Sequence, residues 1–147
     1  MDDMDDALPT ESDFVVHGDL DEQAACRHFL GRTRGEVRAL LEENFLYYQE
    51  DFMFMGAPAF CFYVSCLLEH AEAAQDEDVD RMTERACAFQ IEGSGAEALR
   101  PCAALVAEAL GAMALRLASR DADAARRAEG TRARYLNLAR GDLAPGA

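Results

Sequence analysis

Residues 58–68 have the sequence PAFCFYVSCLL, and this stretch decides the fold. From Phe60 to Leu68 the residues are apolar on every side of a helix, which is typical of a helix surrounded by other helices. Pro58 is well placed in the first turn of such a helix. A membrane span from Phe52 to Leu68 is the rival interpretation. That segment is shorter than the roughly 20 residues that a span needs, and a Gly-Ala-Pro sequence interrupts it, so we favour a central core helix.

Recurring start and stop signals predict further helices on both sides of this one. Two capping boxes, Asp19 with Glu22 and Thr33 with Glu36, satisfy backbone N–H groups at helix starts. Pro101 is expected to bend or restart its helix, because proline removes a backbone donor. The expected helices cover residues 19–30, 33–48, 58–74, 79–91, 96–119 and 121–139. With short connections and no alternating apolar stretches, they predict an all-α fold, a compact bundle of about five to six helices.

The chain has 147 residues, which fits a single domain. Residues 1–13 hold six acidic residues and no basic residue, so we expect an acidic tail that is disordered or loosely docked. Residues 14–141 are expected to form the helical domain, with the apolar residues 14–16 docked on the helices. Residues 142–147 are expected to be a frayed C-terminus.

The net charge of −14 narrows the range of partners. Nucleic acids and anionic membranes are disfavoured, because phosphate binding needs clustered Lys and Arg, whereas here 28 acidic residues outnumber 14 basic residues, all of them arginines. The imbalance is uneven: residues 1–80 contain 20 acidic residues and four arginines, whereas residues 81–147 contain eight and ten. A cationic partner that approaches the first half is therefore expected.

Five cysteines, an odd number with irregular spacing, are interpreted as reduced core residues. They are Cys26, Cys61, Cys66, Cys87 and Cys102. Reduced cysteines are typical of the cytoplasm. The first residues, MDDMDD, do not resemble a secretory signal, so we expect a cytoplasmic protein.

Metal sites have two candidates, and neither is complete. Asp76, Asp78 and Asp80 alternate like the carboxylates of a calcium loop, but the sixth position, which should be glycine, is Arg81. The twelfth position, which should be glutamate, is Cys87. One zinc pair is also conceivable, Cys66 with His70, but no second ligand pair accompanies it. We therefore expect no metal.

Catalytic patterns are equally weak. A P-loop is excluded by the lack of lysine, and Gly93-Ser94-Gly95 is interpreted as a turn between helices. Carboxylate pairs such as Glu42 with Glu50 cannot be told from surface acids. A cysteine nucleophile would need an electropositive setting, which these apolar stretches do not provide. We expect no enzymatic activity, no catalytic residue and no cofactor.

Residues 44–56, NFLYYQEDFMFMG, are the segment with most functional information. Two tyrosines, two adjacent acids and several large apolar residues cluster at a helix end. These residues can close the core as an elbow between helices. They can also form an interface, because Tyr and Met are enriched where protein partners dock. Both interpretations can hold together.

Three blocks of sequence resemble bacterial immunity proteins, which are encoded beside interbacterial toxins. The blocks are residues 28–31 (HFLG), 47–56 (YYQEDFMFMG) and 60–63 (FCFY). The resemblance covers residues 26–63. It implies a cytosolic protein that binds a toxin and occludes its active site.

Our leading hypothesis is an immunity protein that neutralises a cognate bacterial toxin with a basic surface. Its acidic surface would cover the toxin's active site, steered there by charge. The expected partner-binding residues are Glu42, Glu43, Tyr47, Tyr48, Glu50, Asp51, Phe54, Asp76, Asp78 and Asp80. One alternative is a helical scaffold or homodimer that pairs through the apolar face of residues 52–62. Another is a small metal-binding protein or enzyme.

Overall fold

The computed structural model describes residues 7–93 and 95–141, and this part of the chain is helical. Its elements are α2 (Glu11–Phe14), α3 (Leu20–Phe29), α4 (Arg34–Glu43), α5 (Phe45–Tyr48), α6 (Asp51–Phe54), α7 (Ala57–Ala74), α8 (Glu77–Glu92), the 3-10 helix η1 (Ala96–Leu99), α9 (Arg100–Leu117) and α10 (Ala122–Ala139). The all-α prediction is confirmed. The expected number of five to six helices is too low, because short helices were missed.

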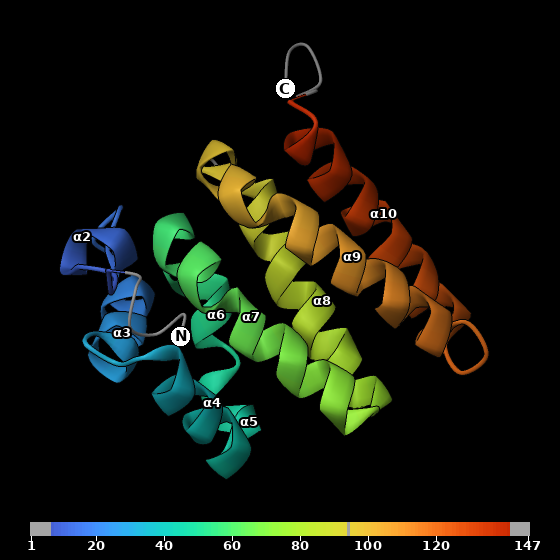
Figure 1. The fold of residues 1–147 in the computed structure, drawn as a ribbon, viewed down its shortest axis with the longest axis horizontal. Helices are drawn as coiled ribbons and strands as arrows, with labels where there is room; N and C mark the ends of the chain where they lie inside the picture. The colour runs from blue at the N-terminus through green and yellow to red at the C-terminus, as the bar shows by residue number, and fades with distance from the viewer. Residues whose placement is uncertain (1–6, 94, 142–147) are drawn as a thin grey trace.

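The long helices form two layers around α7 (Figure 1). α7, α8, α9 and α10 run along a common diagonal, each antiparallel to the one before it, and α2, α3 and α4 lie on the side of α7 away from α10. α7 contacts α2, α4, α8, α9 and η1, and α10 packs chiefly along α9. The prediction of a central helix over residues 58–74 is therefore confirmed.

The side chains of α7 explain its central place. Phe60, Tyr63, Val64 and Leu67 are fully buried, and each such side chain contributes about 1.5–3 kcal/mol relative to exposure. The Tyr63 hydroxyl donates hydrogen bonds to the carbonyl oxygens of Arg32, at 2.7 Å, and Phe29, at 3.2 Å. Burial raises the pKa of Tyr63 to about 12, so its hydroxyl keeps the proton that it donates. α7 thus holds the α3–α4 turn in place.

Three local signals act as the sequence predicts, and one was missed. Asp19 and Thr33 cap α3 and α4 in capping boxes with the glutamates three residues on. α9 restarts after η1 with Pro101 in its first turn. The helix expected over residues 33–48 is broken at Asn44, which ends α4 and caps α5 by accepting a hydrogen bond from Tyr47 N at 3.1 Å. Asparagine competes for backbone hydrogen bonds in this way and so interrupts helices.

The N-terminal layer closes against the start of α7. Residues 1–6 of the expected acidic tail lie outside the described residues, and its last residues, 11–13, belong to α2. Phe14 is fully buried, and its carbonyl oxygen accepts a hydrogen bond from Gly56 N at 2.8 Å. A Cβ atom at Gly56 would lie 2.3 Å from the Asp13 carbonyl oxygen, so only glycine permits this contact. The expected frayed end, 142–147, also lies outside the described residues.

One segment of the described chain, Ala96–Leu117, is long and apolar enough to cross a membrane by length and composition. Its mean hydropathy is 1.5, and 44% of that window is buried in the fold. The segment comprises η1 and α9, and α9 packs on α10, α7 and α8. Packing within the bundle buries some of its apolar residues, such as Val106 and Leu110, whereas Leu105 and Leu115 are exposed. The span considered from Phe52 onward is divided between α6 and α7.

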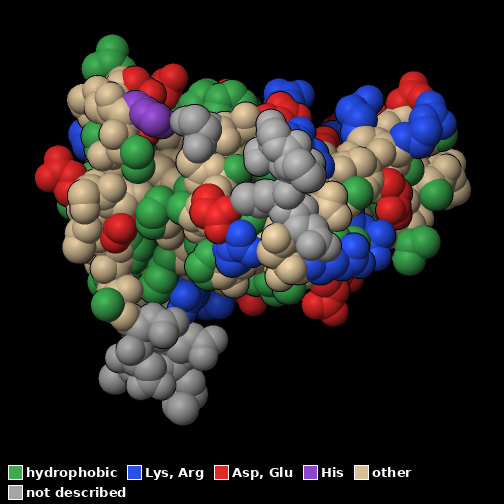
Figure 2. Space-filling view, turned by 90° about the horizontal axis from the view of Figure 1, so that it is seen from above, with side chains coloured by type: hydrophobic (Ala, Val, Ile, Leu, Met, Phe, Trp, Pro, Cys, Tyr) green, Lys and Arg blue, Asp and Glu red, His purple; other side chains and the backbone are tan. Residues whose placement is uncertain are grey.

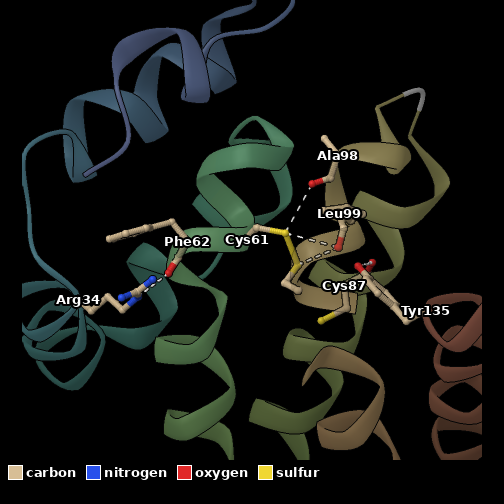
Figure 3. Close-up of a disulfide and its surroundings, with 8 residues drawn as sticks. Arg34, Cys61, Phe62, Cys87, Ala98, Leu99 and Tyr135 are labelled. Atoms are coloured by element: carbon tan, nitrogen blue, oxygen red, sulfur yellow. Dashed lines mark hydrogen bonds between the residues drawn. A yellow bond between two sulfur atoms is a disulfide. The ribbon is translucent and has the colours of Figure 1, made fainter. Parts of the chain in front are cut away.

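A disulfide joins Cys61 of α7 to Cys102 of α9 (Figure 3). Their Cα atoms are 5.2 Å apart, a separation that a disulfide can bridge. The expectation that all five cysteines are reduced is therefore wrong for this pair. The two residues are 41 positions apart in sequence, and only the packing of α7 on α9 brings them together. Cys26, Cys66 and Cys87 are free and buried.

Opening this disulfide is expected to destabilise the fold without changing it. The bond closes a long loop, and the lost loop-closure entropy corresponds to on the order of 3 kcal/mol of unfolding free energy. Urea unfolding of the oxidised protein, the reduced protein and the Cys61→Ser/Cys102→Ser variant would measure the loss. Reduced protein and variant should unfold at the same lower midpoint. Identical midpoints for oxidised and reduced protein would contradict the prediction.

A second link between helices is a buried ion pair. Arg116 of α9 contacts both carboxylate oxygens of Asp80 on α8, through Nη2 at 2.8 Å and Nε at 3.2 Å. Asp80 is 2% exposed and Arg116 18% exposed. Arg116 also reaches Glu72 of α7 at 2.6 Å. It therefore ties three core helices together.

Removing the arginine from this pair should be costly. Arg116→Met leaves the Asp80 carboxylate buried without its partner, which typically destabilises a protein by about 3 kcal/mol or more. Asp80→Asn in the same chain should restore part of that loss. The matched control is Arg126→Met, because Arg126 and its partner Asp123 are 72% and 73% exposed. Chemical denaturation giving equal losses for Arg116→Met and Arg126→Met would refute this role.

Candidate functional site

The candidate site is centred on residues 44–56, which we call the elbow. It consists of the short helices α5 and α6, joined by Gln49 and Glu50, and it connects α4 to α7. Its C-terminal end is held by Gln90 of α8, whose side-chain nitrogen lies 2.9 Å from the Phe52 carbonyl oxygen and 2.8 Å from that of Met55. The elbow is therefore a defined structure with fixed ends.

His28 connects the elbow to helix α3. Its Nδ1 atom lies 2.7 Å from Oδ2 of Asp51 on α6. Because a carboxylate only accepts hydrogen bonds, Nδ1 carries the proton. Asp51 is 7% exposed. Burial raises its pKa above the ordinary value of 3.8, and the hydrogen bond from His28 opposes that rise.

An aromatic cluster surrounds His28. The Tyr47 hydroxyl lies 3.3 Å from Nε2 of His28. The His28 ring lies 5.2 Å from the Tyr47 ring and 5.6 Å from the Tyr48 ring, centroid to centroid. Tyr48 packs inward on Phe29, whereas Tyr47 is 56% exposed and the neighbouring Leu46 is 69% exposed. The exposed side chains of Leu46 and Tyr47 thus lie next to a packed aromatic cluster.

Three of the acids predicted to bind a partner lie next to this cluster. Glu42 and Glu43 are exposed at the end of α4, and Glu50 is exposed between α5 and α6. We define the elbow surface as His28, Leu46, Tyr47, Tyr48, Glu42, Glu43 and Glu50. It combines apolar contact area with unburied negative charge, the two components of an electrostatically steered interface.

The other predicted acids have structural roles. Asp51 is buried against His28, and Asp80 is buried against Arg116, so neither carboxylate faces solvent. Asp76 caps α8 by accepting hydrogen bonds from Asp78 N at 2.8 Å and Val79 N at 3.2 Å. Asp78 is paired with Arg81. The negative charge expected at the start of α8 is thus locally offset by arginines of the second half of the chain.

Phe54 points away from the tyrosines. It is half-buried, and its ring meets that of Phe89 on α8 edge to face at a centroid distance of 5.4 Å. Phe54 therefore belongs to a different part of the surface from Tyr47 and Tyr48. Two members of the elbow surface, His28 and Leu46, were not among the predicted partner-binding residues. His28 had one usable signal, since it lies in the last turn of a predicted helix beside Phe29.

The conceivable metal ligands are used in packing. Within residues 7–93 and 95–141, there is no group of three or more His, Cys, Asp or Glu side chains that could hold a metal ion. The His70 ring stacks on Phe45 at a centroid distance of 4.9 Å. The Cys66 sulfur lies 3.5 Å from the Arg34 carbonyl oxygen, and burial raises the pKa of its thiol to about 11.

Charge is distributed unevenly over the molecule. Seen from above, the side that carries α9 and α10 shows arginines interspersed with acids, and hydrophobic side chains are more prominent over the N-terminal layer (Figure 2). Several arginines from the second half pair with acids from the first: Arg81 with Glu77 and Asp78, and Arg116 with Glu72 and Asp80. Within the part of the chain that the structure describes, the exposed acids of the elbow surface, Glu42, Glu43 and Glu50, form no such ion pair.

Comparison of the chain with protein-family models, with curated proteins and with solved structures found no match.

His28 should matter to stability mainly through Asp51. His28→Ala leaves a buried carboxylate without its hydrogen bond, which should lower the unfolding free energy by about 1–3 kcal/mol at neutral pH. Tyr47→Ala is the control, and it should cost less because that ring is largely exposed.

The loss caused by His28→Ala should shrink in acid. A carboxyl group whose pKa is raised by folding destabilises the fold above that pKa, and this contribution disappears as pH falls through the folded pKa toward 3.8. Removing His28 enlarges the penalty for the ionised form only. Urea denaturation at a series of pH values should therefore bring variant and wild type together in acid, and a deficit independent of pH would disprove the link.

Proposed function

We propose that this chain is an immunity protein that binds a cognate bacterial toxin and covers its active site with an acidic surface. The observation that carries the proposal is the elbow surface, where Leu46 and Tyr47 are exposed next to Glu42, Glu43 and Glu50. The local likeness of residues 26–63 to immunity proteins includes His28, Tyr47, Tyr48 and Glu50, which lie on this surface.

The two components of the surface have different tasks in this proposal. The acids attract a basic cleft and speed encounter, an effect that salt weakens. Tyr47 and Leu46 then provide the buried contact area, since aromatic anchors at the centre of an interface carry most of its energy.

The shape of the elbow supports a rigid docking surface. Asn44 caps α5, His28 holds α6, and Gln90 holds the exit toward α7. A surface that is already ordered loses less conformational entropy on binding than a flexible loop does. We therefore expect the elbow to keep its conformation in the complex.

Asp51, Asp76, Asp78 and Asp80 are left out of the proposed contact. Asp51 and Asp80 are buried, and Asp76 and Asp78 are engaged by the first turn of α8. Phe54 is also left out, because its ring packs against Phe89 of α8 rather than against the tyrosines.

The proposal places the protein in the cytoplasm, where the toxin would otherwise act. Reducing conditions there would keep Cys61 and Cys102 as thiols. The disulfide lies between α7 and α9, so the elbow should bind equally well in its oxidised and reduced forms.

A homodimer is the second candidate. One hypothesis from the sequence is self-association through residues 52–62, but the large side chains Phe52 and Phe60 of this segment are fully buried. The exposed leucines of α9 offer a different face, with Leu105 46% and Leu115 79% exposed. This candidate would be favoured if light scattering gave the mass of a dimer for the wild type and the mass of a monomer for the Leu105→Glu/Leu115→Glu variant.

Reversing the charge of the elbow should abolish protection from the toxin. The Glu42→Arg/Glu43→Arg/Glu50→Arg variant would be co-expressed with the toxic product of the gene adjacent to its own, and growth of the host would be measured. The wild type should restore growth and the variant should not, because like charges now meet. Affinity should fall by 100-fold or more, at roughly 1 kcal/mol for each reversed charge.

The control reverses three exposed acids far from the elbow, Glu108, Asp123 and Glu129, which are on α9 and α10. It changes the net charge equally and should keep protection. If both variants protect equally, or if the wild type rescues no lethal neighbour, the proposal is wrong.

A further inference from the structure

A pocket of about 450 Å³ is lined in part by residues 53–56, the C-terminal end of the elbow, and Tyr47 is not among its lining residues. Its lining comes from the loop before α3, the first turn of α3, the end of α6, the start of α7 and the last turns of α8. This volume lies within the range of small-molecule sites in proteins. The elbow surface does not use the pocket.

The wall of the pocket is mostly apolar. Phe54 and Phe89 form one side through their edge-to-face contact, and Met53, Met55 and Pro58 line the rest. Phe89 is 47% exposed, which is unusual for a phenylalanine on a well-packed helix. An apolar group that enters here would cover this ring.

The polar rim of the pocket cannot receive an anion. Helix starts and loops often bind anions through unpaired N–H groups. Here the Glu22 carboxylate, 4% exposed, accepts hydrogen bonds from the N–H groups of residues 16–19, the shortest being 2.7 Å from Gly18 N and 2.9 Å from His17 N. The donors that an anion would need are already occupied by an internal carboxylate.

Two further carboxylates make the rim negative. Asp21 is exposed in the first turn of α3, and Asp19 is exposed and uses one oxygen, Oδ1, to cap Glu22 N at 2.8 Å. Both line the pocket, together with the ring of His17. With Glu22 included, the three carboxylates outweigh the roughly half positive charge of the helix start.

We propose that this pocket binds a small amphipathic organic cation, with an alkyl or aryl group against Phe54 and Phe89 and a protonated amine at Asp19 and Asp21. The apolar part of the ligand is buried against the two rings, and its ammonium group is attracted by the carboxylates of the rim. This site does not depend on the toxin-binding role of the elbow.

Three probes of similar length test the proposal: 4-phenylbutylammonium, 4-phenylbutanol and 4-phenylbutyrate. They would be titrated in low salt at about pH 8 and followed by NMR of the labelled methionine methyl groups. The signals of Met53 and Met55 should shift. The cation should bind about three- to five-fold more tightly than the alcohol, since an exposed ion pair contributes at most about 1 kcal/mol, and the anion should bind most weakly.

Three variants locate the binding. Asp21→Asn should reduce the preference for the cation over the alcohol. The control Glu108→Gln removes one negative charge at an exposed position of α9 and should leave that preference unchanged. Phe89→Ala should weaken the cation and the alcohol alike, with an unchanged circular dichroism spectrum showing that the fold is intact. Equal affinity for all three probes, or binding that Phe89→Ala leaves unchanged, would overturn the proposal.

Discussion

Burial of the large apolar side chains of α7 is the constraint on which the rest of the structure depends. A helix that is apolar on all sides needs neighbours on all sides, and the two layers provide them: α2 and α4 on one side, α8 and α9 on the other. Tyr63 shows how strict this requirement is, since its buried hydroxyl is accommodated by hydrogen bonds to two carbonyl oxygens of the α3–α4 turn. The elbow serves the same requirement, because it connects α4 to the start of α7 and adds the buried side chains of Phe52 and Met55 to the core.

The helices could be predicted from the sequence to the extent that their signals are local. Asp19, Thr33 and Pro101 act within a few residues of themselves, and each marks a helix start as expected. Asn44 is also a local signal, but the periodic apolar residues on both sides of it outweighed it in the sequence. Short helices such as α2 and α6 have too few residues to show a period, and their existence depends on contacts such as that between Gly56 and Phe14.

The site was less predictable because it depends on pairs that are distant in sequence. Glu42, Glu43, Tyr47 and Glu50 are placed on the surface as expected. Nothing near Asp80 indicates that it faces Arg116, and nothing near Asp51 indicates that it faces His28. The spacing of apolar residues shows which face of a helix is buried. It does not show which charged residues on two different helices form a pair. Cys61 and Cys102 were missed for the same reason.

The division of the tyrosines gives this chain a built-in optical probe. It has no tryptophan, so its four tyrosines are its main fluorophores. Tyr63 and Tyr135 are sealed in the core, whereas Tyr47 and Tyr48 belong to the elbow surface. Anything that covers the elbow changes the surroundings of half of the emitters and leaves the other half as an internal reference. The native protein can thus report on its own complexes by ultraviolet emission, with no dye attached.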